Sequence, residues 1–184
     1  TSSAASDVYK RQVFSNKRIE GMRDDIQAIA DQLISEWIDD GEVDLLNRLC
    51  VPLPIYVIAD QLGVPRSELT LLKKWSDAST SRLGRLADEE QQIQNAKDIV
   101  EFQHYFADLI DRMREQPEDN IISDLANNTI DEGRLLTKPE ALGMIQQILV
   151  AGNETSTNAI AGGVVLLIEN PEEQAKLRAN PDLI

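Results

Sequence analysis

The feature that most constrains the fold is a stretch of over thirty residues that keeps a helical apolar period without interruption. It starts at Thr137, where Glu140 completes the pattern of a capping box and Pro139 occupies the first helical turn. It ends at Asn170, because Pro171 disfavours helical backbone in the residue before it. A helix of this length is on the order of 50 Å long. We therefore expect one long helix over about residues 137–170.

Helical periods also fill the rest of the chain from residue 14 onward. Apolar residues at steps of three and four predict further helices over residues 15–37, 44–62, 66–83, 89–115 and 171–177. Pro52 and Pro54 interrupt the second of these, so it should kink or start late. A short helical turn is predicted at 119–125, and a small hairpin or irregular loop at 131–136. With no internal repeat and no convincing strand, the predicted fold class is all-α.

Two of these helices are each predicted to bury one apolar stripe. The stripe of helix 15–37 consists of Ile19, Met22, Ile26, Ile29, Leu33 and Trp37. The stripe of helix 89–115 consists of Ile93, Ala96, Ile99, Phe102, Phe106, Leu109 and Met113. The acidic runs at 24–25, 39–40 and 88–90 are predicted to be helix caps and solvated faces.

Composition narrows the function classes. The 184 residues suggest one domain, and their formal net charge of -14 disfavours nucleic acid or an anionic membrane surface as a partner. No run of 18 apolar residues occurs and no secretory signal is visible, so we expect no membrane association. A single cysteine, Cys50, suits a reducing cytoplasm. One Cys and one His, His104, exclude a four-ligand Cys/His zinc site.

The first twelve residues differ from the rest of the chain. They are small and polar and lack apolar periodicity. Residues 2–12 resemble a translated cloning or sequencing adapter, and a disordered native arm is the alternative. We therefore expect residues 1–12 to be a non-native or disordered segment and residues 13–184 to form the folded domain.

The middle of the long helix departs from ordinary helix composition. Gly152 stands in the interior, followed by Glu154 and Thr155, whereas a helix interior is normally free of glycine and of side chains that hydrogen-bond to the backbone. Thr155 can bond back to the carbonyl of residue 151, which would widen or bend the helix there. Ala151 and Gly152 are small enough to let a flat ligand approach the backbone closely. A local loss of helix stability of this kind indicates a functional site.

The six residues from Ala151 to Ser156 resemble the (Ala/Gly)-Gly-x-(Asp/Glu)-Thr-(Thr/Ser) signature of the central helix of cytochrome P-450, the haem-thiolate monooxygenases. The flanks fit bacterial soluble members of that family. They are Asn-Pro-Glu-Glu-Gln at 170–174, Pro-Leu-Pro at 52–54 and Leu-Gly-Val-Pro at 62–65. The resemblance covers about 14–184 and implies an internal fragment of that fold, containing the oxygen-binding helix but not the loop whose cysteine ligates the haem iron.

The resemblance also implies roles for individual residues. Ala151 and Gly152 would form the oxygen-binding groove over the haem. Thr155 would hydrogen-bond to dioxygen during the reaction, and Glu154 would relay protons from solvent. Gln147 and Val150 would face the substrate, and Asn153 replaces the commoner His, which alters the proton path or a contact to a neighbouring helix. No haem ligand is expected in this chain, and Cys50 reads as a small buried residue.

The function that follows is a haem-dependent monooxygenase that inserts one atom of dioxygen into a small or medium apolar organic substrate. By the resemblance, the full-length protein uses haem b and takes electrons from a ferredoxin and ferredoxin reductase, while the fragment alone is inactive. The alternative is a cofactor-free all-α interaction or regulatory domain. Such a bundle has no reason to weaken its longest helix at Gly152, Glu154 and Thr155.

Overall fold

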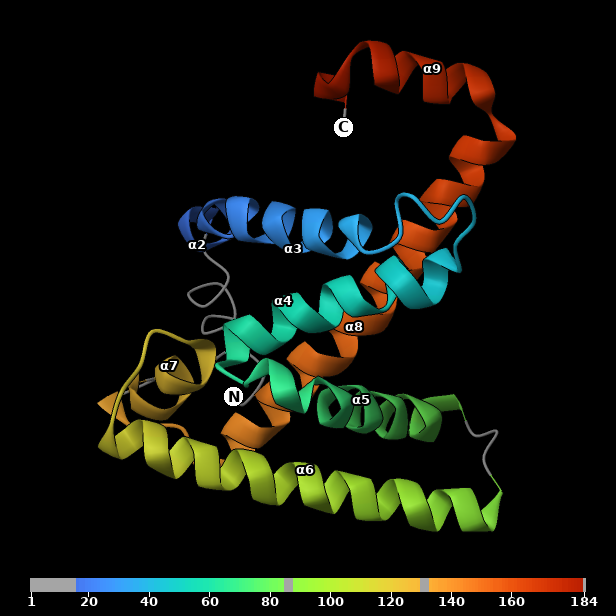
Figure 1. Cartoon of the computed structure of the whole chain (residues 1–184). Coiled ribbons are helices and arrows are strands. Elements are labelled where there is room, and N and C mark those ends of the chain that lie inside the picture. Colours follow the sequence, from blue (N-terminus) through green and yellow to red (C-terminus); the bar gives the residue numbers. More distant parts are fainter. Residues whose placement is uncertain (1–15, 85–87, 130–132, 184) are drawn as a thin grey trace.

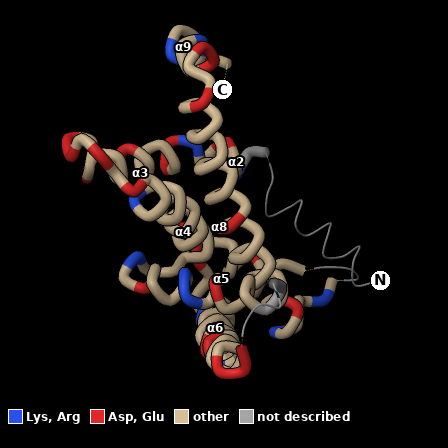
Figure 2. Tube along the Cα trace, turned by 90° about the vertical axis from the view of Figure 1, so that its right-hand side faces the viewer, with Lys and Arg blue, Asp and Glu red and all other residues tan. Residues whose placement is uncertain are grey.

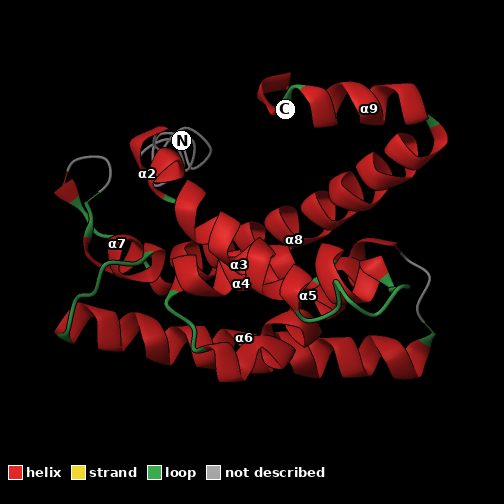
Figure 3. Cartoon of the chain, turned by 45° about the horizontal axis from the view of Figure 1, so that its top comes forward, coloured by secondary structure: helices red, strands yellow, loops and turns green. Residues whose placement is uncertain are grey.

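The chain is an all-α assembly arranged around one long helix (Figure 1). The computed structural model describes residues 16–84, 88–129 and 133–183. Its helices are α2 (Asn16–Gly21), α3 (Arg23–Ser35), α4 (Pro52–Leu62), α5 (Leu69–Gly84), α6 (Glu89–Glu115), α7 (Ile121–Asn127), α8 (Lys138–Glu169) and α9 (Pro171–Ala179). Shorter helical turns cover Leu46–Cys50, Arg66–Glu68 and Pro181–Leu183. Within the described ranges no strand forms beyond an isolated bridge between Thr129 and Leu135 (Figure 3).

The hydrophobic core lies where α4, α5, α6 and α7 meet the first half of α8. Aromatic side chains of α5 and α6 fill part of it, with ring centroids 5.9 Å apart for Trp75 and Phe102 and 4.7 Å apart for Phe102 and Phe106. The far end of α8 and the whole of α9 project away from the other helices (Figures 1 and 3). No residue of α9 is buried. The apolar core therefore holds the first half of α8, and after Thr157 no residue of this helix is buried.

The start of α8 confirms the predicted capping box. The Thr137 backbone N–H donates to Glu140 Oε2 at 2.9 Å, and the Arg134 guanidinium pairs with Glu140 Oε1 at 2.8 Å. The hydrogen bonds from Arg134 and Thr137 lower the pKa of Glu140 to about 2. The helix then continues without a break to Glu169, as its period predicts.

Two prolines shape the entry into α4. Residues Leu46–Cys50 form a π-helical turn, and α4 begins only at Pro52, which confirms the predicted late start. Pro54 has no N–H to donate to the carbonyl of Cys50, four residues earlier. The hydroxyl of Thr157 on α8 donates to that carbonyl instead, at 3.0 Å. A long-range side chain thus satisfies a backbone group that the proline leaves without a helical partner.

Two predicted stripes need correction. The first helix is divided at Met22, and Ile19, in the short helix α2 before this break, is 51% exposed. In α6 the buried face near the start is polar: Ile93 is 53% exposed, whereas Asn95 and Asp98 are buried. The start of α6 turns this polar side inward because it meets polar groups of α5. Asn95 Nδ2 donates to Ser81 Oγ at 3.0 Å, and Lys74 of α5 lies 3.7 Å from Asp98.

Ala96, the next residue of the predicted α6 stripe, is exposed for the same reason. The later part of that stripe, from Ile99 to Met113, is buried as predicted. The predicted short helix at 119–125 is α7, capped by Asn120 Oδ1, which accepts from the Ser123 N–H at 2.8 Å.

The acidic surface follows the sequence pattern. All residues of the acidic runs at 24–25, 39–40 and 88–90 are exposed, and acidic segments lie on the outer sides of α3 and α6 (Figure 2). His104 is also exposed on α6. In the described part of the chain, even α8 does not combine enough length and apolar character to cross a bilayer. The expected N-terminal segment 1–12 lies outside the described residues, as does part of the expected hairpin at 131–136.

The capping box makes a testable contribution to stability. Replacing Glu140→Gln removes the ion pair and weakens the cap, which should lower the free energy of unfolding by about 1 kcal/mol at neutral pH. Because the folded-state pKa of Glu140 is depressed to about 2, its stabilisation is complete above the unfolded-state pKa and is lost as pH falls from there towards 2. Chemical denaturation of both forms across this range should show the difference shrinking. Glu169→Gln, at the exposed end of α8, is the matched control and should show no such loss.

Candidate functional site

The candidate site lies at the middle of α8, where the two sides of the helix have opposite environments. Ala151, Glu154 and Thr155 are exposed, whereas Asn153 and Thr157 are buried. Residues 151 and 155 are one turn apart and share a face, and residues 153 and 157 share the opposite one. The helix therefore presents the small residue, the hydroxyl and the carboxylate away from the core.

The predicted back-bond of Thr155 is present. Its hydroxyl donates to the carbonyl of Ala151. The helix nevertheless remains α-helical through this turn, so the expected local widening does not occur. The π-helical turn of the described chain lies at Leu46–Cys50 instead.

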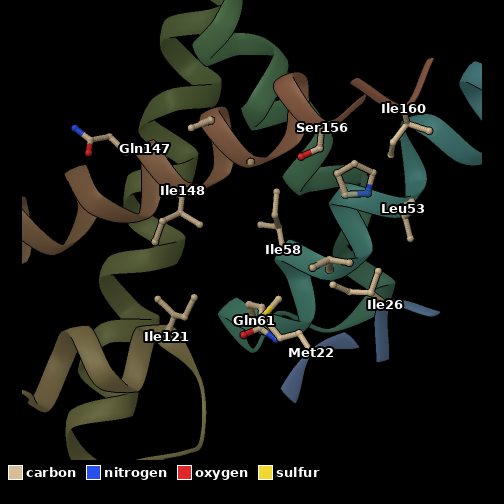
Figure 4. A pocket seen from close by; sticks show the side chains of 14 residues that line it. Met22, Ile26, Leu53, Ile58, Gln61, Ile121, Gln147, Ile148, Ser156 and Ile160 are labelled. Carbon is tan, nitrogen blue, oxygen red and sulfur yellow. The ribbon is translucent and has the colours of Figure 1, made fainter. Parts of the chain in front are cut away.

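An apolar groove of about 620 Å³ runs along α8 beside these residues (Figure 4). Its walls come from the α2–α3 junction, α3, α4, α7 and α8. The lining residues are Met22, Ile26, Leu53, Pro54, Val57, Ile58, Gln61, Ile121, Gln147, Ile148, Ala151, Gly152, Ser156 and Ile160. Figure 4 shows Ile148, Ile58 and Ile121 in the space between the α8 ribbon and the helices that face it, whereas the Gln147 side chain extends away from them.

The groove separates the predicted site residues into two sets. Gln147, Ala151 and Gly152 line it, whereas Val150, Glu154 and Thr155 do not. At Gly152 the groove wall is also approached by α4. A Cβ built there would lie 3.2 Å from Ile58 Cδ1. The glycine thus lets two helices approach each other, and the exposed Ala151 is the small residue that a ligand can reach.

Cys50 cannot supply a thiolate ligand in this setting. Its side chain is completely buried, and burial raises the pKa of the thiol above its ordinary value. A protonated thiol in an apolar environment acts as a small hydrophobic residue. Across the residues that the structure describes, no three His, Cys, Asp or Glu side chains are grouped so that they could hold a metal ion.

Two buried polar residues of α8 bond to other elements, and of these Thr157 was not assigned a role from the motif. Asn153 Nδ2 donates to Ser76 Oγ of α5 at 3.0 Å, and the Thr157 hydroxyl bonds to the Cys50 carbonyl. The Asn153 contact is the contact to a neighbouring helix that its departure from His suggested. The signal for Thr157 is its spacing, because it continues the buried row of Ile145 and Leu149 at steps of four.

Comparison with known proteins identifies the family. The sequence profile of cytochrome P-450 matches residues 68–183. The chain is 36% identical over 173 residues to the cytochrome P-450 monooxygenase PikC of Streptomyces venezuelae, covering 93% of this chain and 40% of that protein. The structure of the Bacillus subtilis bacillaene polyketide synthase cytochrome P-450 PksS aligns with a TM-score of 0.88 and 28% identity, covering 96% of this chain and 44% of that one.

A second solved structure has a similar fold. Cytochrome P-450 BioI, in complex with an acyl carrier protein ligated to hexadec-9Z-enoic acid, aligns with a TM-score of 0.89 at 26% identity, over 98% of this chain and 46% of that one. The chain thus spans about 40% of the length of the curated relatives it matches. These matches show that the chain belongs to the cytochrome P-450 family and contains the helical part of the fold around α8.

The family uses haem, and the described residues fit one side of such a group. Ala151 and Thr155 are exposed, one turn apart on α8, so a flat apolar ring can lie against the helix there. The short Ala151 side chain leaves the neighbouring backbone accessible. Cys50 would not hold the iron of such a group, because its thiol is fully buried and burial raises its pKa.

The close approach at Gly152 gives a direct test of its role. Alanine in a helix interior is about 1 kcal/mol more favourable than glycine. At Gly152 the added Cβ meets Ile58, so Gly152→Ala should gain much less than this. Gly143→Ala in the same helix, where nothing lies within 4 Å, should show the full gain.

A double-mutant cycle with Ile58→Val tests whether Ile58 Cδ1 is the atom that limits Gly152→Ala. In the Ile58→Val background, which lacks Cδ1, Gly152→Ala should recover the gain that the clash cancels. Thermal or chemical denaturation measures all four variants. Equal gains at residues 143 and 152 in the original background would show that α4 does not limit position 152.

Proposed function

We propose that the full-length protein is a haem-dependent monooxygenase that inserts one atom of dioxygen into an apolar organic substrate. The observation that carries the proposal is the exposure of Glu154 and Thr155 together with Ala151 on the face of α8 turned away from the core. Membership of the cytochrome P-450 family supports it, as do relatives whose names state monooxygenase or hydroxylase activity.

In this proposal haem supplies the redox chemistry with dioxygen, and the chain supplies position and protons. The Thr155 hydroxyl has one proton and two lone pairs, and its proton is directed to the Ala151 carbonyl. Rotation about χ1 redirects this proton to a ligand on the exposed face. Glu154, the adjacent residue, is exposed to solvent. A carboxylate next to a hydroxyl is suited to pass protons inward through water.

The surroundings support an apolar substrate. Gln147 lines the groove and Val150 is half-buried on the adjacent turn, and we propose that both face the substrate side of the site in the full-length protein. Named relatives include a vitamin D(3) 25-hydroxylase and a steroid C26-monooxygenase, which are consistent with bulky apolar substrates. We propose a ferredoxin and its reductase as the electron donor and the cytoplasm as the location.

Substitutions at the two residues test these roles in the full-length protein. Thr155→Ala should divert electrons from product to hydrogen peroxide, because the hydroxyl that directs the proton is lost. Glu154→Gln should slow turnover about a hundredfold, the lower end for a lost acid–base group. Product, peroxide and reduced cofactor consumed are measured together, with Asn158→Ala, exposed on α8 and outside the groove lining, as the control.

The proposal has a clear contrary result. Unchanged coupling in Thr155→Ala would remove that residue from the reaction. A carbon monoxide difference spectrum of the full-length protein that lacks the thiolate band would contradict the haem-thiolate assignment and favour the cofactor-free helical domain.

A further inference from the structure

The buried face of α8 changes character just where the candidate site begins. Ile145, Leu149, Asn153 and Thr157 follow one another at steps of four and are each 8% exposed or less. The first two are apolar, and the last two are polar and hydrogen-bonded to other elements. Glu154 and Thr155 lie between the two polar positions, on the other side of the helix.

Asn153 fastens α8 to α5. Its amide donates to the hydroxyl of Ser76, which is 1% exposed, at 3.0 Å. The amide Oδ1 is buried and receives no donor from the described residues. A buried acceptor without a partner destabilises the folded state, and an apolar pair of similar shape would avoid that cost. Stability alone therefore does not account for a polar pair at this place.

Thr157 fastens α8 to the turn before α4. Its hydroxyl donates at 3.0 Å to the Cys50 carbonyl that Pro54 leaves without a helical donor. In the described part of α8 no residue after Thr157 is buried. This bond is thus the last fixed contact of the buried face before α8 leaves the core.

We infer that Asn153 and Thr157 are positioning residues that set the rotation of α8 about its axis, and thereby the direction in which Thr155 and Ala151 point. Apolar burial is non-directional and tolerates small rotations, whereas a hydrogen bond weakens steeply as its angle changes. Two such bonds, one turn apart and to two different elements, define one rotation. Successive residues are about 100° apart around a helix, so the direction of Thr155 is fixed relative to Asn153 and Thr157. If the helix rotates about its axis as one body, Thr155 moves by the same angle as these two residues.

The positioning role rests on the proposed function, since it concerns the presentation of Thr155 to a haem ligand. Carbon monoxide bound to the reduced full-length protein is the probe, because its C–O stretching band responds to neighbouring hydrogen bonds and requires no known substrate. Asn153→Ala and Thr157→Val should broaden the band and shift it in the direction produced by Thr155→Ala. Thr157→Ser, which keeps the hydroxyl, should retain the original band.

Two further variants separate positioning from simple loss of stability. Leu125→Ala, in the buried face of α7, should destabilise the protein by opening a cavity but leave the C–O band unchanged. The pair Ser76→Ala with Asn153→Leu removes the polar contact as a unit, so the protein should stay folded while the band still shifts. A band that is unchanged in both Asn153→Ala and Thr157→Val, or one that Leu125→Ala shifts equally, would overturn the inference.

A measurement that needs no haem keeps the two proposals distinguishable. In a double-mutant cycle of Ser76→Ala and Asn153→Ala, the unfolding equilibrium constants should show about fivefold coupling, the net effect of one buried hydrogen bond. Additive effects would overturn the Asn153 anchor whether or not haem binds. A missing thiolate band together with intact coupling would instead overturn the proposed function. The hydrogen bonds of Asn153 and Thr157 would then remain as features of the fold alone.

Discussion

The rest of the fold depends on the burial of one face of α8. The helices α4, α5, α6 and α7 all contact this one helix, and the core contains its residues Ala141, Met144, Ile145 and Leu149. Residues two apart on a helix point in nearly opposite directions, so the burial of Asn153 and Thr157 turns Ala151 and Thr155 away from this core. The position of Glu154 and Thr155 outside the core is therefore a consequence of what Asn153 and Thr157 do inside it.

The wall of the apolar groove contains residues that a helical period predicts to be buried but that remain partly accessible. Met22 and Ile26, which the helical period assigns to a buried stripe, are only half-buried along its wall. A helical period records which face of a helix is apolar. Whether that face meets another part of the protein is decided by tertiary structure, and this chain spans about 40% of the length of its curated relatives. Met22 and Ile26 thus fit the apolar pattern of the helix. They stay accessible because no described element covers them.

Local chemistry made most of the fold predictable. The capping box at Thr137 and the Asn170-Pro171 break define α8 within one residue, and Asp88 caps α6 through the N–H of Gln91. These signals depend on neighbours within four positions. The polar burial of Asn95 and Asp98 could not be predicted in this way, because Ser81 and Lys74 on another helix determine it.

The same distinction applies to the site. The motif predicts Glu154 and Thr155 as site residues from their local spacing with Ala151 and Gly152, and this assignment stays a prediction. The partners of Asn153 and Thr157 lie 77 and 107 positions away in the chain, so no periodic pattern could assign them. The contact beside Gly152 could not be predicted either, since Ile58 comes from α4, far away in the sequence.

The segment from 151 to 157 combines features that weaken a helix locally with contacts that hold it from outside. Gly152 costs about 1 kcal/mol relative to alanine, and the bond from Thr155 to the Ala151 carbonyl competes with the regular backbone ladder. Neither interrupts α8, which stays helical throughout. The contacts at Gly152, Asn153 and Thr157 reach α4, α5 and the π-helical turn respectively, so three separate elements support these two turns. A helix that is supported in this way can carry glycine and the two candidate residues Glu154 and Thr155 at its middle, because its geometry no longer depends on its own propensity.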